Sequence, residues 1–228
     1  MRKLLVLLAL AGCGFVDYKA APVGKFEGAL FVMWVDESQR GLGDGSFVFV
    51  PTADPLRFTR GAKGTVQVIE PAMMYTDGGS IPQMAQAMNG FSPWGYAPAY
   101  MVHDWLFVAR KCALDGQATP AEAVVAEMPF IESAEIAAEA IKSLIAAGKV
   151  QPNDVAPQAI SYAVAGPVSR QLWNKKGGCQ RIKPEHLAMI RRALPSVQPV
   201  MEAAPGKRRM AAPAPQGPVA KVVQVVGF

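Results

Sequence analysis

The order of local signals along the chain constrains its fold most, because strand signals come first and helix signals follow. Between residues 28 and 70, short runs rich in branched and aromatic residues alternate with Gly and Pro, a pattern typical of a small antiparallel sheet. The expected strands cover residues 29–35, 47–50, 56–59 and 65–69. After Pro82 the pattern becomes helical. We therefore expect an α+β fold, with a small N-terminal antiparallel sheet packed against a C-terminal set of helices.

Four helical stretches are expected in the second part of the chain. They cover residues 96–111, 120–147, 154–173 and 184–194. Pro98 and Pro184 suit first helical turns, where a missing N–H costs nothing. Pro129 and the Gly166-Pro167 pair are expected to interrupt the second and third stretches.

Composition divides the chain into one domain with extensions at both ends. With 228 residues, 51% of them hydrophobic, the chain is long enough for a sizeable core and too apolar to be largely disordered. After residue 15 no apolar run approaches the roughly 20 residues of a membrane-spanning helix. We expect a signal peptide at 1–12, a polar spacer at 13–27, a single α+β domain at 28–194 and a disordered Pro/Ala-rich tail at 195–228. Residues 219–226 could add a strand.

The net charge of +5 overstates the basicity of the domain. Five of the basic residues lie in the expected signal peptide and tail: Arg2, Lys3, Lys207, Arg208 and Arg209. The net charge of the remaining chain is therefore close to zero. A basic surface that could bind nucleic acid is therefore not expected.

The N-terminus has the features of a secretory signal. A basic start at Arg2 and Lys3 precedes an apolar run and the box Leu10-Ala11-Gly12-Cys13. A buried core segment is the alternative, but the order of the three features favours a signal. The box resembles that of bacterial lipoproteins, which implies that Cys13 is acylated, for instance with palmitate, and that a lipid membrane is a partner. Because residue 14 is not Asp, the resemblance implies the outer membrane, facing the periplasm.

Two cysteines remain once Cys13 is set aside. Cys112 and Cys179 form an even pair in an expected oxidising compartment, so one disulfide between them is plausible. Two unrelated buried thiols are the alternative, because a sequence does not give their separation.

The most unusual polar residues are His103 and Asp104, which stand within the apolar stretch 99–108. A helix that is apolar on nearly all faces is buried, and a buried imidazole or carboxylate needs partners. The loop at residues 75–82 is the best source of them, with Asp77, two glycines and Ser80. Asp77 could instead form an Asx-turn with its own backbone.

The segments Thr76-Asp77-Gly78-Gly79-Ser80-Ile81-Pro82 and Tyr100-Met101-Val102-His103-Asp104-Trp105-Leu106 together resemble a domain-of-unknown-function family that is common in tailed-phage and prophage genomes. The family pattern is TD-x-x-S-x-P followed by a His-Asp pair, and the resemblance covers roughly residues 28–175. It implies a fold neighbourhood and no particular reaction. An Ala-Asp pair of the family is matched here only by Ala134-Glu135, with Glu139 one turn later, and residues 111–129 look inserted.

Two functions follow from these residues. In the first, Asp77, Ser80, His103 and Asp104 form a hydrolase-like catalytic site that acts on an envelope component, with Glu135 or Glu139 nearby. Asp77 and His103 could then also hold one divalent metal ion.

In the second, the same residues form a buried polar network in a non-catalytic module, which binds an envelope or phage protein. Adjacent helical residues point about 100° apart, so His103 and Asp104 are not expected to face one small site. His186 is expected to be a solvated residue in a first helical turn.

Overall fold

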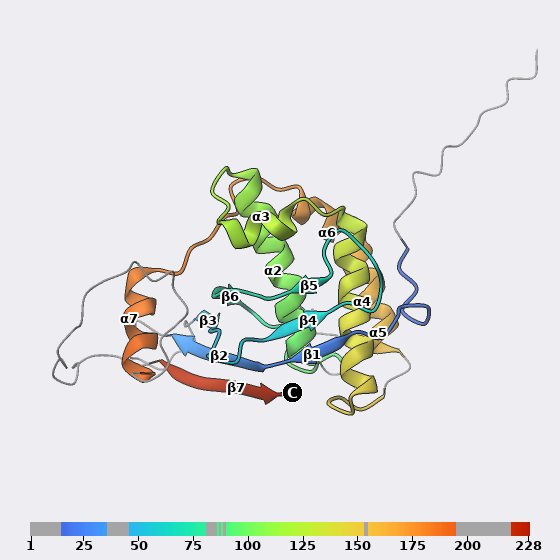
Figure 1. The fold of residues 1–228 in the computed structure, drawn as a ribbon, viewed down its shortest axis with the longest axis horizontal. Coiled ribbons are helices and arrows are strands. Elements are labelled where there is room, and N and C mark those ends of the chain that lie inside the picture. Colours follow the sequence, from blue (N-terminus) through green and yellow to red (C-terminus); the bar gives the residue numbers. More distant parts are fainter. Residues whose placement is uncertain are drawn as a thin grey trace, which may run out of the picture.

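The computed structural model describes residues 15–35, 46–80, 86, 88, 90–152, 155–194 and 220–228. The predicted signal peptide, Cys13, residues 81–82 of the loop motif and most of the predicted tail lie outside these residues. The described part confirms the α+β class, with two antiparallel sheets formed mainly by the N-terminal part and helices that follow (Figure 1).

The larger sheet has the strand order β6-β3-β2-β7 and is antiparallel throughout. Its strands are β6 (Met74–Thr76), β3 (Ser46–Phe49), β2 (Ala29–Val35) and β7 (Lys221–Gly227). Strand β2 pairs with β3 in the register Val32 to Phe49, and β3 pairs with β6 in the register Phe47 to Thr76. The pairing of β3 with β6 sets the position of Thr76, the last residue of β6.

The smaller sheet has the order β1-β4-β5, so the single expected sheet is wrong in this detail. Its strands are β1 (Lys25–Glu27), β4 (Arg57–Thr59) and β5 (Val68–Ile69). The break between β1 and β2 falls at Gly28, whose φ is +82°. A Cβ there would lie 2.0 Å from the carbonyl oxygen of Pro55, so only glycine allows this bend.

Six helices follow in the described part, close to the expected ranges. They are α2 (Ala97–Leu114), α3 (Pro120–Ala126), α4 (Phe130–Ala146), α5 (Ala156–Ala165), α6 (Pro167–Trp173) and α7 (Pro184–Ala193). Pro129 and Gly166 are the N-caps at the two expected interruptions. Within the described ranges, no helix combines the length and apolar character that a membrane span requires.

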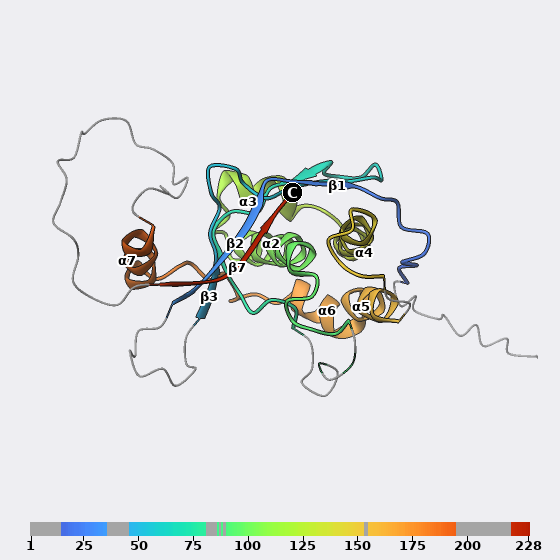
Figure 2. The ribbon, with the colours of Figure 1, turned by 90° about the horizontal axis from the view of Figure 1, so that it is seen from below.

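Helix α2 is the centre of the molecule. Figure 2 shows it between the strands on one side and α4, α5 and α6 on the other. Most of its apolar residues are buried. Met101, Val102 and Leu106 are fully buried and belong to the same core as the strand residues Leu30, Val32 and Phe49. Burial on both sides explains why this helix reads as apolar along most of its length.

The disordered tail predicted at 195–228 is wrong at its end, where the alternative of a strand within residues 219–226 is confirmed: residues 221–227 form β7. This strand pairs with β2, with Leu30 opposite Val226 and Phe31 opposite Val225. Phe228 follows and stacks on Phe26, with ring centroids 5.0 Å apart. Strand β2 has an edge that β3 does not cover, and a valine-rich segment supplies the backbone groups that this edge needs.

The predicted spacer at 13–27 is also wrong in its described part. Residues 25–27 form β1, and Val16 is buried against Ala134 and Ala138 of α4. The ammonium group of Lys142 donates to the carbonyl oxygens of Lys19 and Ala21, both at 2.6 Å. Helix α4 therefore holds this segment as part of the domain.

Candidate functional site

The loop that carries Asp77 starts where β6 ends and lies against the start of α2. Gly78 has a φ of +76°, and a Cβ there would lie 2.5 Å from the carbonyl oxygen of Pro93. The N–H of Gly79 donates to that same oxygen at 2.7 Å, and a Cβ at Gly79 would lie 2.7 Å from the Tyr100 ring. The two glycines are thus required for the close approach of loop and helix.

Thr76 connects the loop to α2. Its hydroxyl donates to Oδ2 of Asp104 at 3.0 Å and accepts from the N–H of Gly78 at 2.9 Å. Sequence reasoning placed Asp104 in a site but gave Thr76 no role. Its position directly before Asp77 was the available signal.

Asp104 has an acidity that suits proton transfer. Although the residue retains some exposed surface, the protein atoms around its carboxyl group raise the pKa to about 8. The negative charge of Asp77 contributes to this rise, whereas the hydrogen bond from Thr76 and the positive charge of Lys111 act in the opposite direction. Asp104 is therefore mostly protonated at neutral pH.

Asp77 and Ser80 form the exposed part of the site. The hydroxyl of Ser80 donates to Oδ2 of Asp77 at 2.9 Å, and both residues are exposed. The structure thus brings three of the predicted catalytic residues near one another: Asp77 and Ser80 share a hydrogen bond at the surface, and the charge of Asp77 acts on Asp104.

His103 is not part of this hydrogen-bonded group. Its ring packs on Phe107, with centroids 4.8 Å apart, and its Nε2 is buried without a hydrogen-bond partner among the described residues. Burial lowers its pKa to about 4, so the imidazole is neutral at pH 7. His103 and Asp104 are adjacent in the sequence, so their side chains leave the helix in directions about 100° apart.

Two tyrosines lie at the start of α2. Tyr96 is the N-cap residue of the helix, and Tyr100 lies one turn before His103. Both hydroxyls are buried and, like Nε2 of His103, have no hydrogen-bond partner in the described ranges. Buried polar atoms of this kind normally bond to an ordered water or a ligand, because leaving them unpaired costs about 1–3 kcal/mol each.

The predicted nearby carboxylates lie elsewhere. Glu139 is buried in an ion pair with Arg60, at 2.7 Å between Oε1 and Nη2, and it accepts from the N–H of Gly61 at 3.2 Å. Glu132 binds the same guanidinium group, and Glu135 is exposed. Placing Glu135 or Glu139 near His103 is therefore wrong, because α4 turns its acidic face to the loop after β4.

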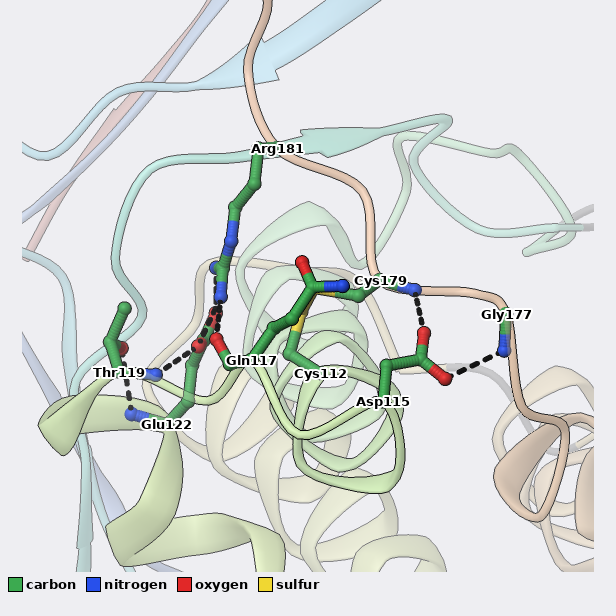
Figure 3. Close-up of a disulfide and its surroundings, with 8 residues drawn as sticks. All are labelled: Cys112, Asp115, Gln117, Thr119, Glu122, Gly177, Cys179 and Arg181. Carbon is green, nitrogen blue, oxygen red and sulfur yellow. Dashed lines mark hydrogen bonds and ion pairs between the residues drawn. A yellow bond between two sulfur atoms is a disulfide. The ribbon is translucent and has the colours of Figure 1, made fainter.

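A disulfide joins Cys112 of α2 to Cys179, with Cα atoms 4.4 Å apart (Figure 3). Beside it, Asp115 accepts hydrogen bonds from the N–H groups of Gly177 and Cys179, at 2.7 and 2.9 Å, and these bonds lower its pKa. These contacts fasten the segment after α6 to the C-terminal end of α2.

An ion pair holds the same segment two residues further on. Arg181 binds the carboxylate of Glu122, which also accepts from the backbone N–H of its N-cap residue Thr119 at 2.7 Å (Figure 3). The Arg181 guanidinium group also donates to the carbonyl oxygen of Gln117. The segment is thus held at both Cys179 and Arg181.

The expectation that His186 is solvated is wrong. Only 4% of the residue is exposed, and its Nδ1 is hydrogen-bonded to the hydroxyl of Tyr75 at 2.8 Å. The N–H of Lys183 donates to the same hydroxyl at 3.0 Å. Sequence spacing gave no signal for this contact, because α7 and β6 are more than 100 residues apart.

No group of three or more His, Cys, Asp and Glu side chains with the arrangement of a metal site occurs among the described residues. Asp77 and His103, the two predicted metal ligands, have no hydrogen bond or ion pair to each other or to a shared third residue in that part of the chain.

A comparison of this chain with protein-family models gives no match, and neither the curated proteins nor the solved structures give one.

Proposed function

We propose that the protein is a lipid-anchored envelope hydrolase in which Asp104 is the general acid and Asp77 the general base. The observation that carries this proposal is the pair itself. The carboxyl group of Asp104, whose pKa is raised to about 8, lies within electrostatic reach of the exposed Asp77 and is hydrogen-bonded to Thr76, the residue before it. Two carboxyl groups in unequal surroundings are the usual basis for dividing acid and base roles.

In the proposed reaction, Asp104 donates a proton to the leaving group of the bond that is cleaved. Asp77 accepts a proton from the attacking water, and Ser80 orients the Asp77 carboxylate through its hydrogen bond. Thr76 holds the Asp104 carboxyl group by donating to Oδ2, which leaves Oδ1 to carry the proton. His103 is outside this scheme, since it is neutral and hydrogen-bonds to none of these groups in the described part.

The location follows from the lipoprotein-like signal. Acylation of Cys13 would anchor the chain in a membrane, and the residue after it suggests the outer membrane with the domain facing the periplasm. An envelope component is then the accessible substrate.

A non-catalytic binding module is the second candidate. It is favoured by His103, whose ring packs on Phe107 and whose Nε2 is buried with no hydrogen-bond partner among the described residues, and by the Thr76–Asp104 bond, which ties the sheet to α2. In this case the hydrogen bonds around Asp77 and Asp104 stabilise a surface that contacts an envelope or phage protein.

Incubating the purified mature domain with isolated cell envelopes tests the proposal, with soluble fragments measured over time. Asp104→Asn and Asp77→Asn should each lower fragment release about 100-fold or more, the usual loss when a general acid or base is removed. Asp54→Asn is the matched control, because Asp54 is exposed and its carboxylate has no hydrogen-bond partner in the described ranges.

Fragment release that the control retains and both site variants lose would support hydrolysis. Wild-type protein that releases nothing, but binds envelopes in a manner that Asp77→Asn abolishes, would instead support the binding module.

A further inference from the structure

Helix α5 is apolar on its exposed face. It contains no charged residue, and Val155, Tyr162 and Ala163 are exposed at its N-cap and along its length. Val155 has helical backbone angles and precedes Tyr162 by about two turns, so the two side chains lie on the same face. The exposed face of a helix normally carries charged or polar side chains, so this face is a candidate contact surface.

The N-terminal segment extends this face. The ring of Phe15 packs on Tyr162, with centroids 5.1 Å apart, and is itself exposed. The next residue, Val16, is held on α5, because its carbonyl oxygen accepts a hydrogen bond from the side chain of Gln158 at 3.4 Å. Phe15, Val155 and Tyr162 are called the α5 surface below.

The charges next to the α5 surface suit an anionic partner. Residues 155–184 contain five basic side chains and no acidic one. Two of the basic residues, Lys175 and Lys176, are exposed directly after α6, the helix that packs on α5 (Figure 2). Val168 and Leu172 of α6 are exposed as well. Exposed apolar side chains beside cations are typical of a surface that binds a membrane with anionic headgroups.

The position of Cys13 also favours a membrane as the partner. Phe15 follows Cys13 by two residues, a length of chain that spans at most about 7 Å. An acyl chain on Cys13 would therefore hold the α5 surface close to the lipid. The acidic residue nearest to Phe15 in the sequence is Asp17, and the basic Lys19 follows it by two residues.

We propose that the α5 surface lies on an anionic phospholipid membrane and orients the domain there, a role that rests on the proposed function only through the acyl anchor at Cys13. The larger sheet is then on the side of α2 that faces away from the membrane (Figure 2). Three apolar side chains bind a membrane weakly and reversibly, so this contact orients the protein and does not replace its anchor.

Vesicle binding by the chain from Gly14 onward tests the contact without the anchor. This chain keeps every described residue and has no acyl group. Its binding is measured by sedimentation while lipid is titrated, with vesicles of phosphatidylglycerol and phosphatidylcholine in equal parts or of phosphatidylcholine alone. The anionic vesicles should bind it about tenfold more tightly, and Lys175→Gln combined with Lys176→Gln should remove most of this preference.

Val155→Asp should weaken binding to the anionic vesicles about tenfold or more, because it replaces an apolar contact by a negative charge. Aspartate is a favoured N-cap residue, so α5 is retained. Val124→Asp on α3 is the matched control and should bind like the wild type. The two valines are 60% and 64% exposed, and Figure 2 shows α3 apart from α5 and α6.

A fluorescent label that is sensitive to its surroundings gives a second measurement. Cys112 and Cys179 are joined to each other, so in Val155→Cys and Val124→Cys the label reacts with the introduced thiol alone. Anionic vesicles should shift the emission to shorter wavelength for the label at position 155 and leave it unchanged at position 124.

Wild-type chain that binds neither kind of vesicle would overturn the proposal and leave the α5 surface to a protein partner. Equal losses from Val155→Asp and Val124→Asp, or equal emission shifts at the two labelled positions, would overturn it as well. The chain used has no acyl group and no hydrolysis is measured, so these outcomes are independent of acylation at Cys13 and of catalysis by Asp104.

Discussion

The Thr76 hydroxyl donates to Oδ2 of Asp104, across 3.0 Å and between residues that are 28 positions apart in the sequence. This bond joins the last residue of β6 to the middle of α2. It is the point at which the larger sheet, the Asp77 loop and the central helix meet, and the predictions below concern the groups on either side of it.

Asp104 should make the protein less stable as the pH rises. Its folded pKa of about 8 exceeds the value of about 3.9 in an unfolded chain, so the folded state binds the extra proton between these values. The stability it contributes is present below pH 4 and is lost as the pH rises through 8. Asp104→Asn should therefore flatten the decline in melting temperature between pH 6.5 and 8. A decline that persists in this variant would contradict the assignment.

His103 should have the opposite effect at lower pH. Its folded pKa of about 4 lies below the unfolded value of about 6.5, so stability is lost as the pH falls through this range. Between pH 4 and 6.5 the two residues oppose each other. His103→Gln should remove the acid-side loss and leave the decline above pH 6.5 intact, as urea unfolding at several pH values would measure. Equal effects above and below pH 6.5 would argue against a neutral His103.

The ion pairs of Arg60 should carry much of the attachment of α4. Arg60 is 4% exposed and binds both Glu132 and Glu139, so Arg60→Met leaves two carboxylates without their counter-charge. Breaking a buried pair in this way costs about 3–5 kcal/mol, a fall of roughly 10 °C in melting temperature for a domain of this size. Arg57→Gln is the control: its pair with Glu70 is largely exposed, so little change is expected. Similar losses from both variants would contradict the role of burial.

Cys13→Ala should abolish lipid labelling and move the protein from membrane to soluble fractions. The expectation rests on the signal-like residues before Cys13, which provide the one anchor proposed for the chain. Labelling with a radioactive fatty acid and fractionation of the cells test it. Membrane association that survives the substitution would require another anchor.

The divalent ion predicted at Asp77 and His103 is tested by elemental analysis of the purified mature protein. A stoichiometric ion in the wild type that His103→Ala removes would support it. An ion that persists in His103→Ala would assign it to other residues, and its absence from both samples would leave acid–base chemistry or a structural role for these residues.

Local signals determined the order and type of most elements. Prolines and glycines such as Pro129 and Gly166 mark interruptions wherever they occur, so the breaks between helices were predictable. The pairing of β7 with β2 was not determined in this way. A valine-rich run after a long Pro/Ala-rich segment has no local feature that identifies its partner strand, and only the uncovered edge of β2 does so.

For the candidate site, too, the sequence determined one part and the tertiary structure decided the other. The sequence alone identified His103 and Asp104 as unusual polar groups, because a carboxylate and an imidazole in an apolar helix require an explanation, and it indicated the loop with Asp77 and Ser80 as the source of their partners. Only the tertiary structure separated them, placing Asp104 under Thr76 and His103 against Phe107. It also assigned Glu139 to Arg60 and His186 to Tyr75. Charge and burial at a side chain depend on elements that are distant in the sequence, so these partners became visible only once the chain was folded.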